Sequence, residues 1–102
     1  MNDEIYTIED IKEMLKEVLK DTEVEKAILF GSYAKNTPTK ISDIDLLIDS
    51  KGKVKGLKFY AIIDRIQEKF NKKVDIIEKI EINRNSKIEN EIQKTGVVVY
   101  EK

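Results

Sequence analysis

The sequence predicts an α+β fold of two layers, in which helices flank a small mixed β-sheet. Apolar residues recur with helical spacing over residues 8–20 and 57–71, as on the inner face of a packed helix. Short apolar runs of strand length occupy residues 27–30, 43–49, 73–78 and 97–100. The order helix, strand, strand, helix, strand, helix, strand predicts a single domain over residues 1–102.

The first half of the chain contains one helix and two strands. Thr7 is a candidate N-cap for the helix over 8–20, with Glu9 and Asp10 in the first turn, where the helix dipole favours negative charge. The apolar run 27–30 stops at Gly31, which is typical of a buried strand followed by a turn. Residues 32–35 fit a single helical turn, and residues 43–49 fit the second strand. The segment 50–56, SKGKVKG, reads as a basic, solvated turn.

The second half of the chain contains two helices, each followed by a strand. Phe59, Ile62, Ile63, Ile66 and Phe70 form the clearest amphipathic stripe, which predicts a helix over 57–71. The run KVDIIE predicts a strand over 73–78. Ile88 and Ile92 indicate a weaker helix over 83–94, for which Gly96 is a candidate C-cap, and the chain closes with a strand over 97–100.

Composition excludes several kinds of chemistry. The 102 residues carry a formal charge of -1 and include no cysteine and no histidine. Disulfides, thiolate nucleophiles, imidazole bases and typical zinc sites are therefore excluded. The balanced charge argues against nucleic acid as a partner. No apolar run reaches the length of a membrane span and the N-terminus lacks a signal-peptide pattern, so we expect a cytoplasmic protein without a membrane partner.

Three aspartates are candidate metal ligands. Residues two apart in a strand point to the same face, so Asp43 and Asp45 project together, roughly 7 Å apart at their Cα atoms. Such a pair suits a hard divalent cation such as Mg²⁺, although a solvated strand face also explains it. Asp75 lies in an apolar run and needs a partner or a cation. If its strand lies beside 43–49, the three carboxylates converge; the alternative is an exposed or lysine-paired Asp75.

The turn at Gly31 and Ser32 is a candidate phosphate site. Glycine allows a ligand to approach the backbone closely, and N–H groups at a helix start attract phosphate oxygens. The Ser32 hydroxyl adds a donor, and Lys35 adds positive charge. An ordinary turn explains the same residues. We expect the four tyrosines to be packing or rim residues, and Tyr33 is the candidate among them to line such a pocket.

Gly31-Ser32, ten intervening residues, Asp43-x-Asp45 and the later Asp75 together resemble the DNA polymerase beta-type nucleotidyltransferase superfamily, in particular the minimal nucleotidyltransferases of prokaryotes. The resemblance covers nearly the whole chain. It implies that Gly31 and Ser32, with Lys35 beside them, bind the phosphates of ATP. It also implies that Asp43, Asp45 and Asp75 are the catalytic residues and bind two Mg²⁺ ions.

The resemblance further implies a biological role. Many minimal nucleotidyltransferases are paired with a HEPN-family ribonuclease toxin and act as the antitoxin by transferring AMP to a toxin tyrosine. Related sequences often have Arg-Gly where this one has Lys35-Asn36. Lysine keeps the charge but lacks the bidentate fork of arginine, which places the phosphate geometry in question and leaves the metal ligands unaffected.

Two hypotheses about function remain open from the sequence. The first is a Mg²⁺-dependent enzyme that transfers AMP from ATP to a protein hydroxyl. The second is a binding module, with weak activity or none, that neutralises or scaffolds a partner by contact. Both predict association with another chain, and replacing Asp43 and Asp45 with asparagine separates them.

Overall fold

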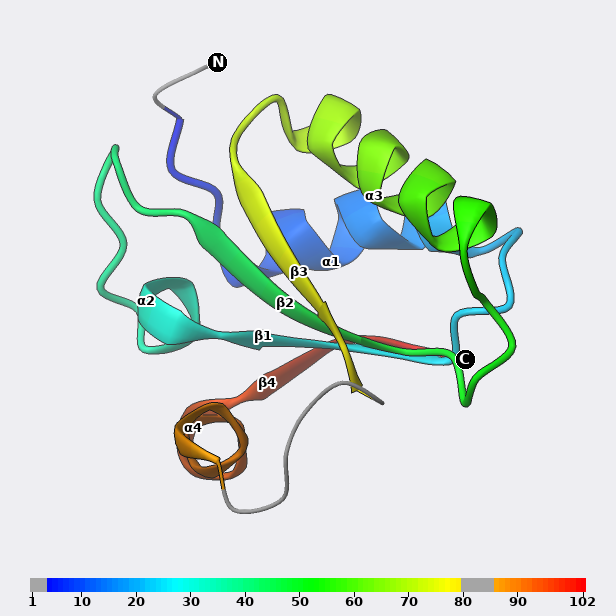
Figure 1. The fold of residues 1–102 in the computed structure, drawn as a ribbon. Helices are drawn as coiled ribbons and strands as arrows, with labels where there is room; N and C mark the ends of the chain where they lie inside the picture. Colours follow the sequence, from blue (N-terminus) through cyan, green and yellow to red (C-terminus); the bar gives the residue numbers. More distant parts are fainter. Residues whose placement is uncertain (1–3, 80–85) are drawn as a thin grey trace.

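A computed structural model describes residues 4–79 and 86–102. Its elements are α1 (Ile8–Leu19), β1 (Lys26–Phe30), α2 (Gly31–Ala34), β2 (Ile44–Asp49), α3 (Leu57–Phe70), β3 (Val74–Glu78), α4 (Lys87–Thr95) and β4 (Val97–Glu101). The strands form one sheet in the order β3-β2-β1-β4. Strand β1 is antiparallel to β2 and β4, whereas β2 and β3 are parallel, which confirms the predicted mixed sheet (Figure 1).

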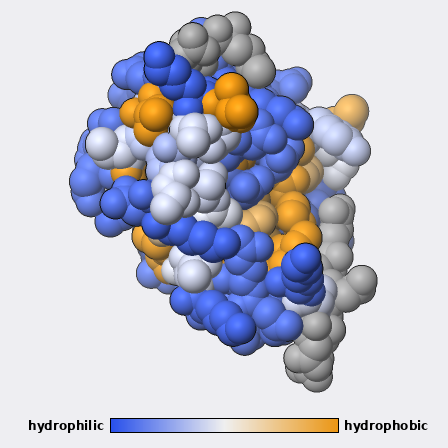
Figure 2. Space-filling view, turned by 90° about the vertical axis from the view of Figure 1, so that its left-hand side faces the viewer, coloured by the Kyte–Doolittle hydropathy of each residue, from blue (hydrophilic) through white to orange (hydrophobic). Residues whose placement is uncertain are grey.

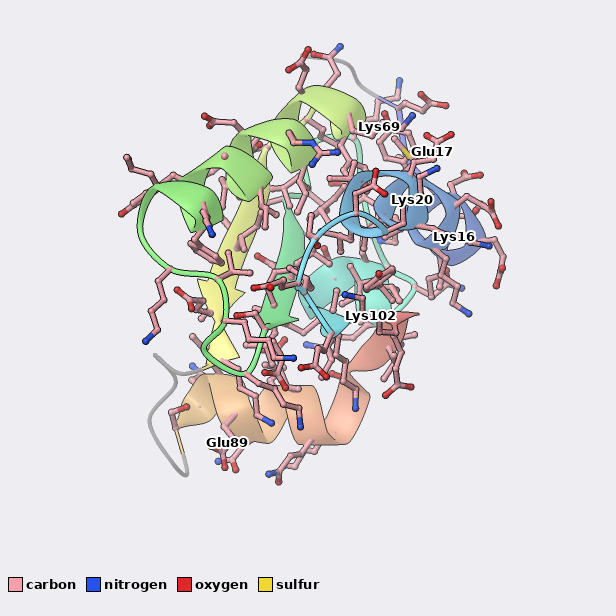
Figure 3. The ribbon with its side chains drawn as sticks, turned by 90° about the vertical axis from the view of Figure 1, so that its right-hand side faces the viewer. Lys16, Glu17, Lys20, Lys69, Glu89 and Lys102 are labelled. Atoms are coloured by element: carbon pink, nitrogen blue, oxygen red, sulfur yellow. The ribbon has the colours of Figure 1, made fainter. Side chains whose placement is uncertain are left out.

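The hydrophobic core lies between one face of the sheet and the helices α1 and α3. Both views of the ribbon place α1 and α3 together on that face, with the sheet separating them from α4 (Figures 1 and 3). The apolar stripes of the two helices and alternate residues of β2 are buried in this layer; fully buried examples are Ile11, Leu15, Ile66, Phe70, Ile44, Leu46 and Ile48. The opposite face of β2 is left to carry Asp45.

The predicted helix boundaries are confirmed to within about a turn. Thr7 caps α1: its Oγ1 accepts the Asp10 N–H, and the Asp10 carboxylate accepts the Thr7 N–H, both at 3.0 Å. This is a capping box. For the helix predicted over 83–94, the start at 83–85 lies outside the described residues, and α4 begins after Ser86, whose hydroxyl accepts the Glu89 N–H at 3.1 Å.

Gly96 ends α4 as predicted, but for a different physical reason. Its backbone is extended, with φ -65° and ψ 143°, and not in the left-handed conformation usual for a glycine cap. A Cβ atom at this position would overlap the Ile92 carbonyl oxygen, which accepts the Gly96 N–H at 2.8 Å. The glycine therefore provides space for a close backbone turn from α4 into β4.

The surface is dominated by polar and charged side chains. The side that carries α2, the loop to β2 and α4 is mostly hydrophilic, with apolar atoms in limited areas (Figure 2).

On the helical side, Lys69 of α3 forms an ion pair with Glu17 of α1 (Figure 3). The hydrogen bond and charge of Lys69 lower the pKa of the Glu17 carboxyl. Among the helices of residues 4–79 and 86–102, none is long and apolar enough to cross a membrane.

Candidate active site

The parallel strands β2 and β3 bring two aspartates side by side. Asp45 and Asp75 are register partners, so their side chains leave the sheet on the same face. Asp43 lies two residues before Asp45, immediately ahead of β2, and not within the strand as predicted from the sequence. The three carboxylates therefore gather where both strands begin, on the face opposite the core.

Asp45 has the most perturbed acidity of this group. Its partial burial, followed by the negative charges of Asp75, Asp43 and Glu91 and a hydrogen bond with Asp75, raises the pKa of the Asp45 carboxyl to about 6. Within the described part of the chain, no ammonium group lies at ion-pair distance from Asp45. The fold thus holds a carboxylate in a place where its negative charge is not compensated.

Lys73 is the cation nearest to the other two carboxylates. Its ammonium group lies 3.5 Å from Asp43 Oδ2 and 4.0 Å from Asp75 Oδ1. All three side chains are well exposed to solvent, which weakens each ion pair. Asp43 and Asp75 therefore share one lysine, which agrees with the lysine-paired alternative for Asp75 in this structure.

Gly31 brings the predicted phosphate turn against Asp45. Its φ of 75° lies in the left-handed region, and a Cβ atom at this position would overlap Asp45 Oδ2. The next residue, Ser32, lies in the single turn α2, whose first N–H groups have no acceptor within the helix. The ten residues between Gly31-Ser32 and Asp43-x-Asp45 therefore form a loop that brings Asp45 back beside Gly31.

Lys35 forms an ion pair across the site. Its ammonium group lies 3.3 Å from Glu91 Oε1, which joins α2 to α4. Glu91 also adds to the negative potential at Asp45, so it is a site residue that sequence reasoning missed. One signal was present: Glu91 directly precedes Ile92 of the Ile88/Ile92 stripe and therefore lies at the edge of the inward helix face.

Tyr33 does not line the site. It is 2% exposed and belongs to the hydrophobic core, and burial raises the pKa of its phenol. The packing alternative for Tyr33 is confirmed and the pocket alternative is wrong, because the turn α2 directs this side chain into the core. Gly31 and Ser32, which precede it in sequence, remain half-buried at the surface.

The donor set fits a hard divalent cation. Carboxylate oxygens are the ligands that Mg²⁺ prefers, and burial together with the neighbouring carboxylates raises the pKa of the Asp45 carboxyl. Among residues 4–79 and 86–102, no three acidic side chains converge closely enough to hold one ion as they stand. Asp43 and Asp75 are within reach of Lys73.

Comparison with known proteins decides the family. A sequence profile described as "Polymerase beta, Nucleotidyltransferase" matches residues 9–102, which is nearly the whole chain. The chain belongs to the polymerase beta nucleotidyltransferase family. It is therefore a nucleotidyltransferase, and the resemblance of its Gly-Ser and Asp-x-Asp motifs to this family is confirmed.

Curated relatives of this nucleotidyltransferase occur in Methanocaldococcus jannaschii. One, named "Putative protein adenylyltransferase", is 36% identical over 97 residues, which span 91% of this chain and 98% of the relative. A second protein of the same name is 34% identical over 83 residues, which span 78% of this chain and 96% of that relative. The similarity covers the proposed phosphate and metal motifs together with the surrounding fold.

Solved structures share the fold of this nucleotidyltransferase at low sequence identity. A chain from a crystal structure of a toxin–antitoxin with AMP-PNP superposes with a TM-score of 0.73 and 16% identity, over 89% of this chain and 73% of that chain. A chain from a tri-AMPylated Shewanella oneidensis HEPN toxin in complex with an MNT antitoxin gives a TM-score of 0.69 and 13% identity, over 94% and 74% of the two chains. These likenesses confirm the predicted polymerase beta-like fold.

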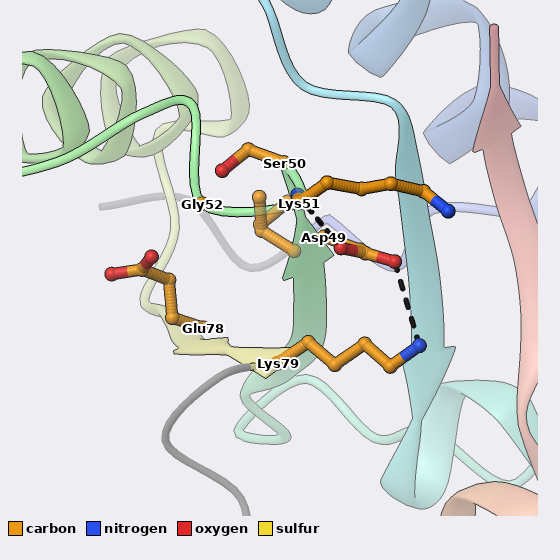
Figure 4. A pocket seen from close by; sticks show the side chains of 7 residues that line it. Asp49, Ser50, Lys51, Gly52, Glu78 and Lys79 are labelled. Carbon is orange, nitrogen blue, oxygen red and sulfur yellow. Dashed lines mark hydrogen bonds and ion pairs between the residues drawn. The ribbon is translucent and has the colours of Figure 1, made fainter.

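A surface hollow lies away from the carboxylates of the nucleotidyltransferase motif. It has a volume of about 440 Å³ and is lined by Asp49, Ser50, Lys51, Glu78 and Lys79 at the far end of β2 and β3 (Figure 4). Asp49 there accepts the Lys51 N–H at 3.0 Å and pairs with Lys79 at 3.6 Å, so it stabilises the turn after β2. This hollow and the motif residues are therefore at opposite ends of the same strands.

Proposed function

We propose that this nucleotidyltransferase transfers AMP from ATP to a hydroxyl group of a protein in a Mg²⁺-dependent reaction. The observation that carries the proposal is the close approach of Gly31 to Asp45, beside the register pair Asp45 and Asp75. This approach supports a role for the Gly31-Ser32 turn in phosphate binding next to carboxylates that bind a cation. The relatives named as protein adenylyltransferases support the choice of AMP and of a protein acceptor.

Each motif residue has a role in this proposal. The backbone N–H groups of Gly31 and Ser32, with the Ser32 hydroxyl, bind the terminal phosphates of ATP. Asp43 and Asp45 hold two Mg²⁺ ions, and Asp75 completes one of the metal sites next to the acceptor hydroxyl. Lys35 turns from Glu91 towards the phosphates, which requires only a side-chain rotation because their ion pair is partly exposed.

The transfer is a displacement at the α-phosphorus. The acceptor oxygen forms a bond to that atom, the bond to the bridging oxygen breaks, pyrophosphate leaves, and the hydroxyl proton passes to water. Bound Mg²⁺ supplies charge neutralisation and lowers the pKa of the hydroxyl, as a site without histidine requires. The protein residues contribute positioning and fixed charge.

The acceptor in this proposal is a tyrosine of a HEPN-type ribonuclease toxin, and the chain acts as its antitoxin. The solved structures with the same fold come from toxin–antitoxin assemblies, one of them with a tri-AMPylated HEPN toxin. We further propose that residues 1–102 act as one nucleotidyltransferase domain. The side chains of Asp43 and Asp75 are exposed, and in this proposal the bound toxin covers them.

The test is transfer of label from α-³²P-labelled ATP, CTP, GTP and UTP in Mg²⁺ to the product of the neighbouring gene, which the proposal expects to be a HEPN-type protein. We expect label from ATP on a toxin tyrosine, confirmed by mass spectrometry, and no transfer in EDTA. Absence of label on that protein and on every other acceptor, with all four nucleotides, would overturn the proposal.

A double variant, Asp43→Asn with Asp45→Asn, separates the enzyme from a binding module. Under the proposal it loses both label transfer and neutralisation of the toxin while it still binds the toxin in pull-down. If the double variant neutralises the ribonuclease as well as wild type does, contact alone is sufficient and the proposed antitoxin mechanism is wrong.

A further inference from the structure

Lys73 occupies a special position among the charged residues around the carboxylates. It directly precedes β3, and its ammonium group lies 3.5 Å from Asp43 and 4.0 Å from Asp75. It is therefore shared by two of the three residues that the proposed function assigns to metal binding. No other lysine among the described residues is within ion-pair distance of these carboxylates.

The backbone around Lys73 is held firmly. The Ile44 N–H donates to the Lys73 carbonyl at 3.1 Å, which ties the start of β3 to the start of β2. The neighbouring Lys72 is 5% exposed, and its ammonium group donates to the Lys40 carbonyl at 3.1 Å. This bond anchors the loop that leads to Asp43.

The side chain of Lys73, by contrast, lies at the surface. It is 58% exposed, and a lysine carries its charge on a flexible four-carbon stem. Exposed ion pairs of this kind are weak, so a divalent ion competes with them readily. A mobile cation on a fixed backbone is thus placed between two carboxylates.

We propose that Lys73 is the resident counter-ion of Asp43 and Asp75, and that its ammonium group must leave them when a divalent cation binds. The inference rests on the proposed metal-binding role of these aspartates. Lys73 is a positioning residue in this scheme: it limits carboxylate repulsion in the metal-free protein, and it lowers the affinity for a free metal ion. In this scheme the protein binds the metal ion more tightly as a complex with ATP than as a free ion.

The test measures Mn²⁺ binding to the nucleotide-free protein from the loss of the electron paramagnetic resonance signal of hydrated Mn²⁺, with Mg²⁺ as competitor. Lys73→Met removes two weak ion pairs, so we expect about three- to tenfold tighter binding. Lys73→Arg keeps the charge and should bind no more tightly than wild type. Lys79→Met is the matched control, because Lys79 follows β3 and pairs with Asp49 at 3.6 Å. The metal affinity of Lys79→Met should change by less than about 1.5-fold, since Lys79 lies roughly 13 Å along the strand from Asp75, beyond the Debye length of about 8 Å at physiological ionic strength.

A second measurement follows the displacement itself. With ¹³C-labelled lysine, the Cε resonance of Lys73 should move towards that of a free lysine as Mg²⁺ is added, whereas the resonance of Lys79 should not move. Equal or weaker metal binding by Lys73→Met, or an unmoved Lys73 resonance at saturating Mg²⁺, would overturn the inference.

Different results would overturn the metal-binding role of the aspartates and the counter-ion role of Lys73. If Asp43→Asn with Asp45→Asn binds Mn²⁺ as wild type does, the metal ligands are wrong, and the role of Lys73 is overturned together with them. If that double variant loses binding while Lys73→Met leaves it unchanged, the metal site stands and only the counter-ion role is overturned.

Discussion

The two ends of the β2–β3 strand pair are built from the same residue types and differ in how charge is matched. Where the strands begin, Asp43, Asp45 and Asp75 meet Glu91, with Lys73 and Lys35 as the cations in ion-pair contact with members of this group. Where the strands end, Asp49 has its own lysine and a backbone N–H donor (Figure 4).

This difference separates a structural carboxylate from a functional one. Asp45 and Asp49 lie on the same strand and the same face, four residues apart. Asp49 stabilises the turn that follows β2, and its charge is satisfied within the protein. Asp45 is held among like charges, which lowers the stability of the folded protein. Such an arrangement is typical of a site where a bound ligand supplies positive charge. Charge matching, rather than the size of the nearby hollow, therefore identifies the site.

The largest expected effect comes from replacing an aspartate with asparagine at each end of the β2–β3 strand pair. Asp45→Asn should lower the rate of AMP transfer on the order of 10³-fold, because metal-assisted charge stabilisation is worth several kcal/mol. Asp49→Asn keeps a hydrogen-bond acceptor for the Lys51 N–H and should leave the rate within about threefold, as for other substitutions away from a site. The measurement is label transfer from ATP, with folding of both variants checked by circular dichroism. Similar losses in both variants would show that the two ends are not functionally distinct.

A pair of glycines tests whether the approach of the phosphate turn to Asp45 matters. Gly31 and Gly52 have nearly equal φ angles, 75° and 77°, so alanine strains the backbone at either by roughly 1–2 kcal/mol. At Gly52 the added Cβ meets nothing within 4 Å, whereas at Gly31 it overlaps Asp45 Oδ2. Because a 1 Å misplacement costs on the order of 10²-fold, we expect that loss of transfer rate in Gly31→Ala. Gly52→Ala should lose stability, measured by urea unfolding, with little loss of rate.

Equal rates in the two glycine variants at matched folded fractions would contradict a role for the Gly31 contact. A second control is Gly31→Ala combined with Asp45→Asn. If the overlap acts through Asp45, the double variant should be no slower than Asp45→Asn alone, because residues that act as a unit are not additive.

Much of the fold follows from local patterns in the sequence. Helical periodicity located α1 and α3, and the alternation in 43–49 correctly placed Ile44 and Leu46 in the core and Asp45 on the other face. Capping chemistry identified Thr7. These features depend on residues close together in the chain, whose periodicity is set by the geometry of one helix or strand.

The parts of the site that escaped prediction depend on packing between distant segments. The adjacency of Asp45 and Asp75 was conditional on the strand order, which periodicity does not determine. The approach of Glu91 to Lys35 requires α4 to lie beside α2, and the burial of Tyr33 requires a turn to face the core. Lys73 was passed over because an exposed lysine has no local signature; its two carboxylates are defined only by the register of β2 and β3.

The smallest expected effect is on stability without metal. The pKa of Asp45 is raised from 3.8 to about 6 in the folded protein, so folding favours its protonated form. Its contribution to stability is present below pH 4 and is lost as the pH rises through 6. In EDTA, Asp45→Asn should therefore match wild type near pH 4 and become more stable above pH 6. One pKa unit corresponds to 1.36 kcal/mol, and solvent screening of this partly exposed group reduces the gain to about 1–2 kcal/mol at pH 8. Asp49→Asn, which loses a matched charge, should show no such gain. Urea unfolding at pH 4, 6 and 8 measures the stability of both variants relative to wild type. If Asp45→Asn is less stable than wild type at pH 8, the charge of Asp45 is compensated within the protein.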